Sequence, residues 1–283
     1  MLQSLKQIKS RIRSIASTKK LTRAMEMVSV AKLKRHERMM GGLKEYASGL
    51  ELLLQKVVSA ASDLHHPYFE KKNSSGGILC LVTSDTGLCS TYNTMAIRAA
   101  ENFVKSHPDK RFRLVAVGKK GLGYFQKRGY DIAASFSGFY GRYSHEISDR
   151  IFEALKESFE ASDVSEVDVV AMRVKNAASR EAVIEKIFPL EVPVLKRLDY
   201  LAEPGVQDIL NALAPVYTRT RFRSLLLNAF LSEHQARAMA MGEATQNALE
   251  LEEGLILLRN KVRQANITRE LIEVVSAAEA LKG

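Results

Sequence analysis

Small and apolar residues recur at steps of three and four over a long C-terminal stretch, from about Tyr217 to Lys282. This spacing places them on one face of an α-helix. The stretch has no proline, and an unbroken helix of roughly 65 residues would be about 100 Å long. Its narrow apolar face predicts one partner helix, as in a coiled coil. The stripe consists of Ala229, Ser232, Ala236, Ala240, Ala244, Ala248, Leu251, Leu255, Leu258, Val262 and Ala265, and it resumes as Ile267, Leu271, Val274, Ala278 and Leu281.

Residues 1–66 form a second stretch without proline, and their apolar residues Leu5, Ile8, Ile12 and Ile15 follow the same spacing. All six prolines lie between these two stretches, from Pro67 to Pro215. The pattern predicts a long antiparallel coiled coil of N- and C-terminal helices, with a different domain inserted between them.

The middle of the chain alternates short apolar runs with amphipathic segments, which is typical of an α/β fold. We therefore expect a mostly parallel, Rossmann-like α/β domain of three layers. Ser84 and Asp85 follow the first strand and are expected to cap the helix that begins near Tyr92. Further helices are expected just after residue 118 and over 144–161. The expected strands are residues 77–83, 112–117, 131–136, 167–174 and 182–190.

These patterns divide the chain at its first proline and near Pro204. Residues 1–66 are predicted to be the N-terminal helix of the coiled coil, residues 67–204 the inserted α/β domain, and residues 205–283 the C-terminal helix. The two helices are predicted to pair as one discontinuous unit.

Positive charge is concentrated at one end of the chain. Residues 1–44 contain 12 lysines and arginines against Glu26 and Glu37, which equals the net charge of +10 of the whole chain. A solvated helix face explains many charge runs, but this concentration favours an acidic partner surface, namely protein, nucleic acid or anionic lipid.

Composition excludes several classes of protein. No segment approaches 18 consecutive apolar residues, so no membrane span is expected. The first residues lack the apolar block of a secretory signal. Cys80 and Cys89 are the only cysteines, which fits a reducing compartment better than a disulfide framework.

No segment predicts an active site. The glycines of the segment GKKGLG, at 118, 121 and 123, do not have the spacing of a phosphate-binding loop, so a tight strand-to-helix turn is favoured. Ser84–Asp85 has no histidine at a recognisable interval. His65 and His66 lack cysteine or aspartate partners for a metal. His234 is interpreted as a residue on the surface of the long helix.

Five segments resemble the gamma subunit family of F-type ATP synthases, in the right order and over nearly the whole chain. The N-terminal helix matches from Ile8 to Leu33 and includes Thr22, Met25 and Lys32. The turn SDTGLC resembles the S-D-x-G-L turn of the family, and Tyr200 with Glu203–Pro204 resembles its Y-x-x-E-P motif. The segments SEHQARAMAM and NKVRQANITRELIEVV, at residues 232–241 and 260–275, resemble its C-terminal helix.

This resemblance implies a non-catalytic subunit, the central rotor shaft that couples the rotation of a proton-driven membrane ring to ATP synthesis or hydrolysis on the beta subunits. It implies the alpha and beta subunits, the epsilon subunit and the membrane rotor ring as partners, with no nucleic acid. No cofactor is expected on this chain, because Mg-ATP and ADP are bound by partner subunits. The implied location is peripheral, on the cytoplasmic face of a bacterial plasma membrane.

The resemblance also implies contact residues. Five are expected to face the ring of alpha and beta subunits: Met25, Arg263, Gln264, Thr268 and Glu270. Tyr200 and Glu203 are expected on the side of the membrane rotor.

The sequence departs from the family at a few positions. Ser90, Thr91 and Ala277 stand where glycines are usual, and Arg259 replaces a usual tyrosine. Two other classes of function were weighed. A DNA-binding coiled coil would show strongly salt-dependent affinity, although residues 1–44 have no aromatic residues interleaved with the basic ones. A nucleotide-using α/β enzyme would bind ATP as an isolated chain.

Overall fold

The computed structural model describes residues 5–60, 65–161, 163–176, 179–193, 203 and 205–280. Its first and last elements are two long helices, α1 (Leu5–Ala60) and α5 (Val206–Ala280). Contacts divide the chain into two compact units. One comprises residues 1–28 with 238–283, and the other comprises residues 29–237. The sequence analysis divided the chain differently, after residues 66 and 204, by following the order of the elements along the chain. Those domain boundaries stay a prediction.

Helix α5 begins at Val206, ahead of the apolar stripe that starts near Tyr217, so Pro215 lies inside it. A proline in a helix interior removes a backbone hydrogen bond and costs about 3 kcal/mol. Leu210 and Ala214 are fully buried in the core of the larger unit, and Tyr217 is 7% exposed. Burial of the apolar residues around Pro215 offsets the cost of the proline. The spacing of apolar residues in the sequence does not show this burial.

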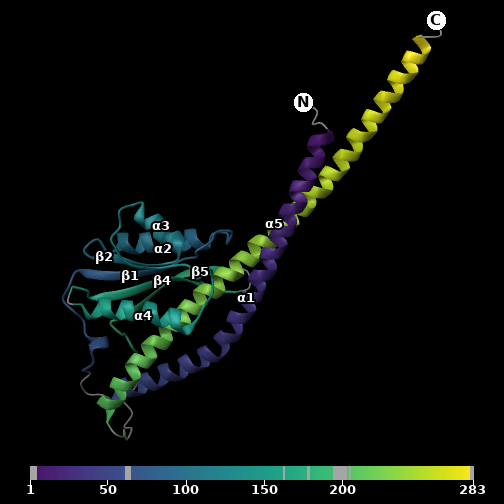
Figure 1. Cartoon of the computed structure of the whole chain (residues 1–283). Helices are drawn as coiled ribbons and strands as arrows, with labels where there is room; N and C mark the ends of the chain where they lie inside the picture. Colours follow the sequence, from purple (N-terminus) through teal and green to yellow (C-terminus); the bar gives the residue numbers. More distant parts are fainter. Residues whose placement is uncertain are drawn as a thin grey trace. The chain divides into compact units, whose positions relative to one another are not determined.

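The larger unit contains a five-stranded sheet in the order β3-β2-β1-β4-β5 (Figure 1). The first four strands are parallel, and β5 is antiparallel to β4. The expected mostly parallel α/β fold is confirmed. The bounds of the strands are β1 (Gly76–Val82), β2 (Arg111–Val117), β3 (Ile132–Phe136), β4 (Glu166–Val174) and β5 (Arg180–Phe188).

Three helices connect the parallel strands, namely α2 (Tyr92–Ser106), α3 (Lys119–Gln126) and α4 (His145–Glu160). Crossovers between parallel strands are right-handed. The chain steps from β1 to β2 to β3 in one direction and then returns past β1 to β4. Helices α2 and α3 therefore lie on one face of the sheet, and α4 lies on the opposite face (Figure 1). A short 3-10 helix, η1 (Pro67–Phe69), precedes β1.

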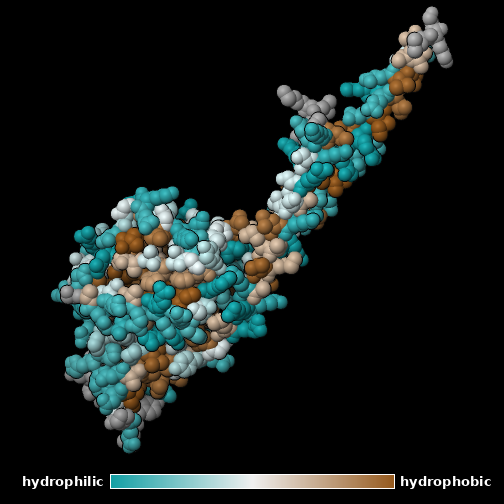
Figure 2. Space-filling view, in the orientation of Figure 1, coloured by the Kyte–Doolittle hydropathy of each residue, from teal (hydrophilic) through white to brown (hydrophobic). Residues whose placement is uncertain are grey.

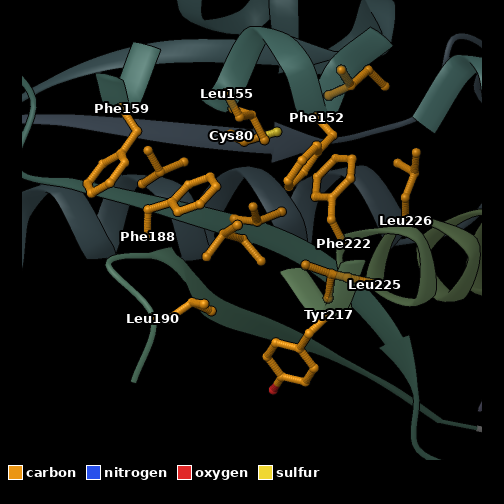
Figure 3. Close-up of a cluster of buried hydrophobic side chains, with 14 of the residues drawn as sticks. Cys80, Phe152, Leu155, Phe159, Phe188, Leu190, Tyr217, Phe222, Leu225 and Leu226 are labelled. Carbon is orange, nitrogen blue, oxygen red and sulfur yellow. The ribbon is translucent and has the colours of Figure 1, made fainter. Parts of the chain in front are cut away.

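Alternate residues of each central strand enter different cores, as the two-residue period of a strand requires. Leu79 and Leu81 of β1 pack with α2 and α3, whereas Cys80 and Val82 face α4. On the α4 side, four phenylalanines gather around the end of β5 (Figure 3). The rings of Phe159 and Phe188 are stacked, with centroids 4.8 Å apart. The others in this group are Phe152 and Phe222.

Part of α5 belongs to this core and is tied to α4 by ion pairs. Arg223 donates two hydrogen bonds to the carboxylate of Asp149, at 2.9 and 2.6 Å. Arg219 pairs with Glu153 one turn away. Because α5 both fills the apolar face and carries these arginines, residues 206–237 belong to the α/β unit as well as to the long helix.

Candidate partner-contact surfaces

In the smaller unit, residues 5–28 of α1 pair with the part of α5 that follows residue 238. Lys19 forms an ion pair with Glu252, and the hydroxyl of Thr245 lies 2.8 Å from that of Thr22. Lys19 precedes Thr22 along α1, whereas its partner Glu252 follows Thr245 along α5, so the two helices are antiparallel. This confirms the pairing predicted from the sequence.

Gly242 of α5 faces Glu26 of α1 in this unit. A Cβ atom at Gly242 would lie 3.7 Å from the carboxyl group of Glu26, which is ordinary contact distance, so an alanine would fit at this position. Arg23 holds the same carboxylate of Glu26 through hydrogen bonds of 3.0 and 3.1 Å.

The pairing does not continue to the end of α5. Every residue from Arg263 to Ala280 is exposed, including the resumed apolar stripe. Figure 2 shows hydrophobic residues interspersed with hydrophilic ones on this end of the chain. The large exposed apolar side chains here are Ile267, Leu271, Ile272, Val274 and Val275, with exposed fractions of 49–66%. An apolar helix face of this length left in water is typical of a surface for another protein.

The predicted contact residues of α5 lie on this exposed segment. Arg263, Gln264, Thr268 and Glu270 are all exposed, and the hydroxyl of Thr268 donates to the carbonyl oxygen of Gln264 at 3.0 Å. Their roles stay a prediction.

The other predicted contact residues lie elsewhere on the chain. Met25 is half-buried on α1. Glu203 is exposed, and Tyr200 lies outside the described residues. Their roles, too, stay a prediction.

The turn after β1 has a structural role that the sequence analysis assigned to the wrong helix. The carboxylate of Asp85 accepts hydrogen bonds from three backbone amides, those of Lys119 at 3.2 Å, Gly138 at 3.1 Å and Tyr140 at 2.8 Å. It therefore caps α3 and fixes the loop before α4. Helix α2 begins instead after Thr91, without a side-chain cap.

Ser84 stabilises the same turn internally. Its hydroxyl bonds to the carbonyl oxygen of Thr86 at 2.5 Å, and its backbone amide donates to the side chain of Asn93 at 2.9 Å. The predicted cap of α2 by Ser84 and Asp85 is wrong. Ser84 bonds within its own turn and to the side chain of Asn93, and Asp85 accepts hydrogen bonds from α3 and from the loop before α4.

Helix α5 covers this turn. Arg237 donates to the carbonyl oxygens of Thr86 and Gly87, both at 3.3 Å, and forms a 2.8 Å ion pair with Glu233. Both side chains of the ion pair are more than nine-tenths buried. Burial raises the pKa of Glu233, and the positive charge of Arg237 opposes that rise. The carboxyl end of β1, where parallel α/β sheets usually bind ligands, is thus occupied by the chain itself.

His234 is buried rather than on the helix surface, so that interpretation was wrong. It is 1% exposed, and its Nε2 lies 2.7 Å from the carbonyl oxygen of Gly141. Its ring lies 5.3 Å from the ring of His36, which is 3% exposed. Burial lowers the pKa of both histidines to about 4, so both are neutral at pH 7. A single histidine in a helical pattern gives no sign of such a contact.

Two further observations concern membrane spans and metal ions. Over the part of the chain that the structure describes, no helix is long and apolar enough to cross a bilayer. In the same residues, no group of three or more histidine, cysteine or acidic side chains is arranged to hold a metal ion.

Comparison with known proteins agrees with these features. A family model described as ATP synthase matches residues 4–281. The ATP synthase gamma chain of Salinibacter ruber is 33% identical over 99% of both chains. That of Solibacter usitatus is 34% identical over 99% of both chains.

Solved structures share the fold. A chain of the Euglena gracilis mitochondrial ATP synthase has a TM-score of 0.66 at 17% identity, covering 98% of this chain and 94% of that one. A chain of the Tetrahymena thermophila mitochondrial ATP synthase, in a structure of the central stalk and c-ring, has a TM-score of 0.58 at 20% identity. It covers 79% of this chain and 99% of that one. The match over nearly the whole length, together with the paired terminal helices, shows that the chain belongs to the ATP synthase gamma chain family.

Proposed function

We propose that this chain is the central rotor shaft of a proton-translocating F-type ATP synthase. In this role it couples rotation of the membrane rotor ring to ATP synthesis or hydrolysis on the beta subunits. The observation that carries the proposal is the exposed apolar end of α5, residues 263–280, in a chain of the gamma family. An apolar helix face that extends beyond its partner helix needs another protein surface to cover it.

The proposed partners follow from this role. The ring of alpha and beta subunits would surround the end of α5, with contacts at Met25, Arg263, Gln264, Thr268 and Glu270. The epsilon subunit and the membrane rotor ring would meet the α/β unit, on the side of Tyr200 and Glu203. Basic residues of α1 give this helix the charge to face acidic segments of the beta subunits.

The chain acts as a non-catalytic subunit. Arg237 donates to carbonyl oxygens of the turn after β1, at the edge of the sheet where parallel α/β folds usually bind ligands. We propose that it has no cofactor of its own, and that Mg-ATP and ADP are bound by the partner subunits. Its location would be peripheral to the membrane through the complex, on the cytoplasmic face of a bacterial plasma membrane.

Reconstitution tests the proposal. The purified chain should show no ATP hydrolysis, and mixing it with the alpha and beta subunits of the same organism should give an active complex. A bead attached to the α/β unit of this chain should then rotate in one direction during hydrolysis. Robust hydrolysis by the chain alone, or an active complex in which the bead stays fixed, would overturn the proposal.

A further inference from the structure

A cavity of about 360 Å³ lies within the α/β unit, between α1 and the segment that leads into α4. Cavities that hold small ligands begin at about this size. Three of its lining side chains are cationic, and they come from both elements. The lining residues are Lys32, Arg35, His36, Gly141, Arg142, Tyr143, Ser144 and Ile147.

The cations are crowded and lack a neutralising partner at the cavity. Lys32 donates to the carbonyl oxygen of Tyr140, an uncharged acceptor, at 2.8 Å. Burial lowers the pKa of Lys32; the charge of Glu233 opposes this, and Arg237 and Arg142 lower it further. Among the described residues that line the cavity, none carries a carboxylate.

The nearby acidic groups already have partners. Glu233 is paired with Arg237 at 2.8 Å. Asp85 accepts hydrogen bonds from the backbone amides of Lys119, Gly138 and Tyr140. Neither carboxylate forms a direct ion pair with the cations of the cavity, and Glu146, in the first turn of α4, is exposed.

Helix α4 starts at the wall of this cavity. Ser144 is its N-cap, and the hydroxyl of Ser144 accepts from the amide of Ile147 at 3.2 Å. The first amides of a helix point outward along its axis and carry a partial positive charge, which favours an anion. The helix has 16 residues, so this dipole is well developed.

His36 is a buried neighbour of these cations in the wall of the cavity, with 3% of its surface exposed. Its Nδ1 atom has no hydrogen-bond partner among the described residues and is enclosed by protein atoms. The cations and the first turn of α4 are therefore the groups that a ligand in the cavity can reach.

We propose that this cavity is a binding site for a phosphate group, held by Lys32, Arg35, Arg142 and the first turn of α4. A phosphate group carries a charge of about −1.5 to −2 at pH 7 and several acceptor oxygens. The charge of a phosphate group balances three cationic side chains better than the single negative charge of a carboxylate does. Arginine forks bind such oxygens in pairs. The site does not depend on the rotor function proposed above.

Titration calorimetry on the full-length purified chain tests this site, with inorganic phosphate as the probe, at constant ionic strength set with chloride. We expect a dissociation constant at or below about 1 mM. Arg35→Gln combined with Arg142→Gln should weaken phosphate binding at least tenfold, which is about 1.4 kcal/mol. Arg35 and Arg142 are exposed, so the variant keeps the fold.

The matched control is Arg38→Gln combined with Arg150→Gln, which removes the same charge from exposed positions of α1 and α4 outside the cavity lining. It should change phosphate binding by less than about twofold, because exposed charges act weakly through water. No binding up to about 20 mM phosphate, a range well above the expected constant, would overturn the proposal. Equal weakening in both variants would also overturn it.

The phosphate could be a free ion or the headgroup of a phospholipid. Sedimentation with phosphatidylglycerol vesicles, compared with phosphatidylcholine vesicles, distinguishes the two. Vesicle binding that inorganic phosphate competes away, and that only the cavity variant loses, assigns the site to the headgroup. Phosphate binding by calorimetry without such vesicle binding assigns it to the free ion.

Discussion

Thr22 and Thr245 meet across the α1–α5 pair, with their hydroxyl oxygens 2.8 Å apart. Thr22 donates its own proton to the carbonyl oxygen of Lys19 at 3.1 Å, so it can accept the proton of Thr245, for which the carbonyl oxygen of Met241 at 2.7 Å is the second acceptor. Thr22 is 9% exposed, which makes this a polar contact largely sheltered from water. The contact helps to fix the register of the two helices. Apolar stripes alone would allow one helix to shift along the other, because apolar contacts are not directional.

Replacing Thr245 with valine removes this hydrogen bond and keeps the shape of the side chain. A typical hydrogen bond contributes about 0.5–1.5 kcal/mol, so we expect a loss of about 1 kcal/mol in the stability of the helix pair. Amide hydrogen exchange of residues 15–28 should report the loss as faster exchange. Asn247→Ala, at an exposed position nearby, is the control and should leave exchange unchanged. Equal exchange in Thr245→Val and the parent would show that the hydroxyl pair adds no stability.

The second prediction concerns Asp168, a buried carboxyl group on β4. It is 3% exposed, and burial together with the charge of Glu166 raises its pKa to about 6. An unfolded aspartate has a pKa of about 3.9. The folded state therefore holds the proton more tightly, and stability falls as the pH rises from about 4 to about 6.

Asp168→Asn should remove this cost. We expect the free energy of unfolding at pH 7 to rise by about 1–3 kcal/mol, because one pKa unit corresponds to about 1.4 kcal/mol. At pH 4 the gain should vanish. Urea unfolding at both pH values measures it. Asp163→Asn is the control, since the side chain of Asp163 is 63% exposed and pairs with Arg113 at the surface. A gain of equal size at pH 4 and pH 7 would contradict the assignment to ionisation.

Much of the fold follows from local patterns. The strands ending at Val82, Val117 and Phe136 lie within one or two residues of their predicted bounds, because buried apolar runs and turn residues carry that signal. Pro215 lies inside α5 although a proline normally ends a helix, and the compensating burial of Leu210 and Ala214 is a tertiary effect.

The polar contacts could not be found in the sequence. Asp85 caps α3, which lies 34 residues away from it, and no local pattern specifies that choice over α2. The burial of His234 depends on a loop that arrives from before α4. For the contact residues, the resemblance placed Arg263 and Gln264 on a helix face that the structure leaves exposed. Exposure shows that they are accessible and does not identify what they touch.

The third prediction compares two glycines of the loop before α4, both with positive φ. A Cβ atom at Gly141 would lie 2.5 Å from the ring of His234, whereas one at Gly138 would meet nothing within 4 Å. Positive φ costs an alanine about 1–2 kcal/mol, so Gly138→Ala should lose about that much stability. Gly141→Ala should lose about 1–3 kcal/mol more, the usual range for overpacking.

Urea unfolding of both variants and the parent checks the difference. The comparison isolates the contact with His234, because the two glycines share the strained backbone region, with φ of +69° at Gly141 and +88° at Gly138. Equal losses in the two variants would mean that the ring of His234 moves aside at little cost.

The last prediction concerns the exposed end of α5 as a contact surface. Arg263 and Gln264 are good helix formers, so replacing both with alanine should leave the helix intact. A hydrogen bond to a charged group contributes about 1.5–3 kcal/mol, and each 1.4 kcal/mol corresponds to about tenfold in a rate when the contact forms mainly in the transition state. Arg263→Ala combined with Gln264→Ala should therefore lower ATP turnover of the assembled complex at least about tenfold, with assembly and melting unchanged.

Arg269→Ala is the control for loss of charge alone, because Arg269 is also exposed on this segment of α5 and is not among the expected contacts. It should keep turnover within about twofold of the parent, since an exposed charge contributes little across water. If the double variant also stays within that range, Arg263 and Gln264 are solvated surface, and the ring must hold α5 through its apolar residues. Leu271 and Val275 are then the next positions to replace, because they lie four residues apart on one exposed face of the helix.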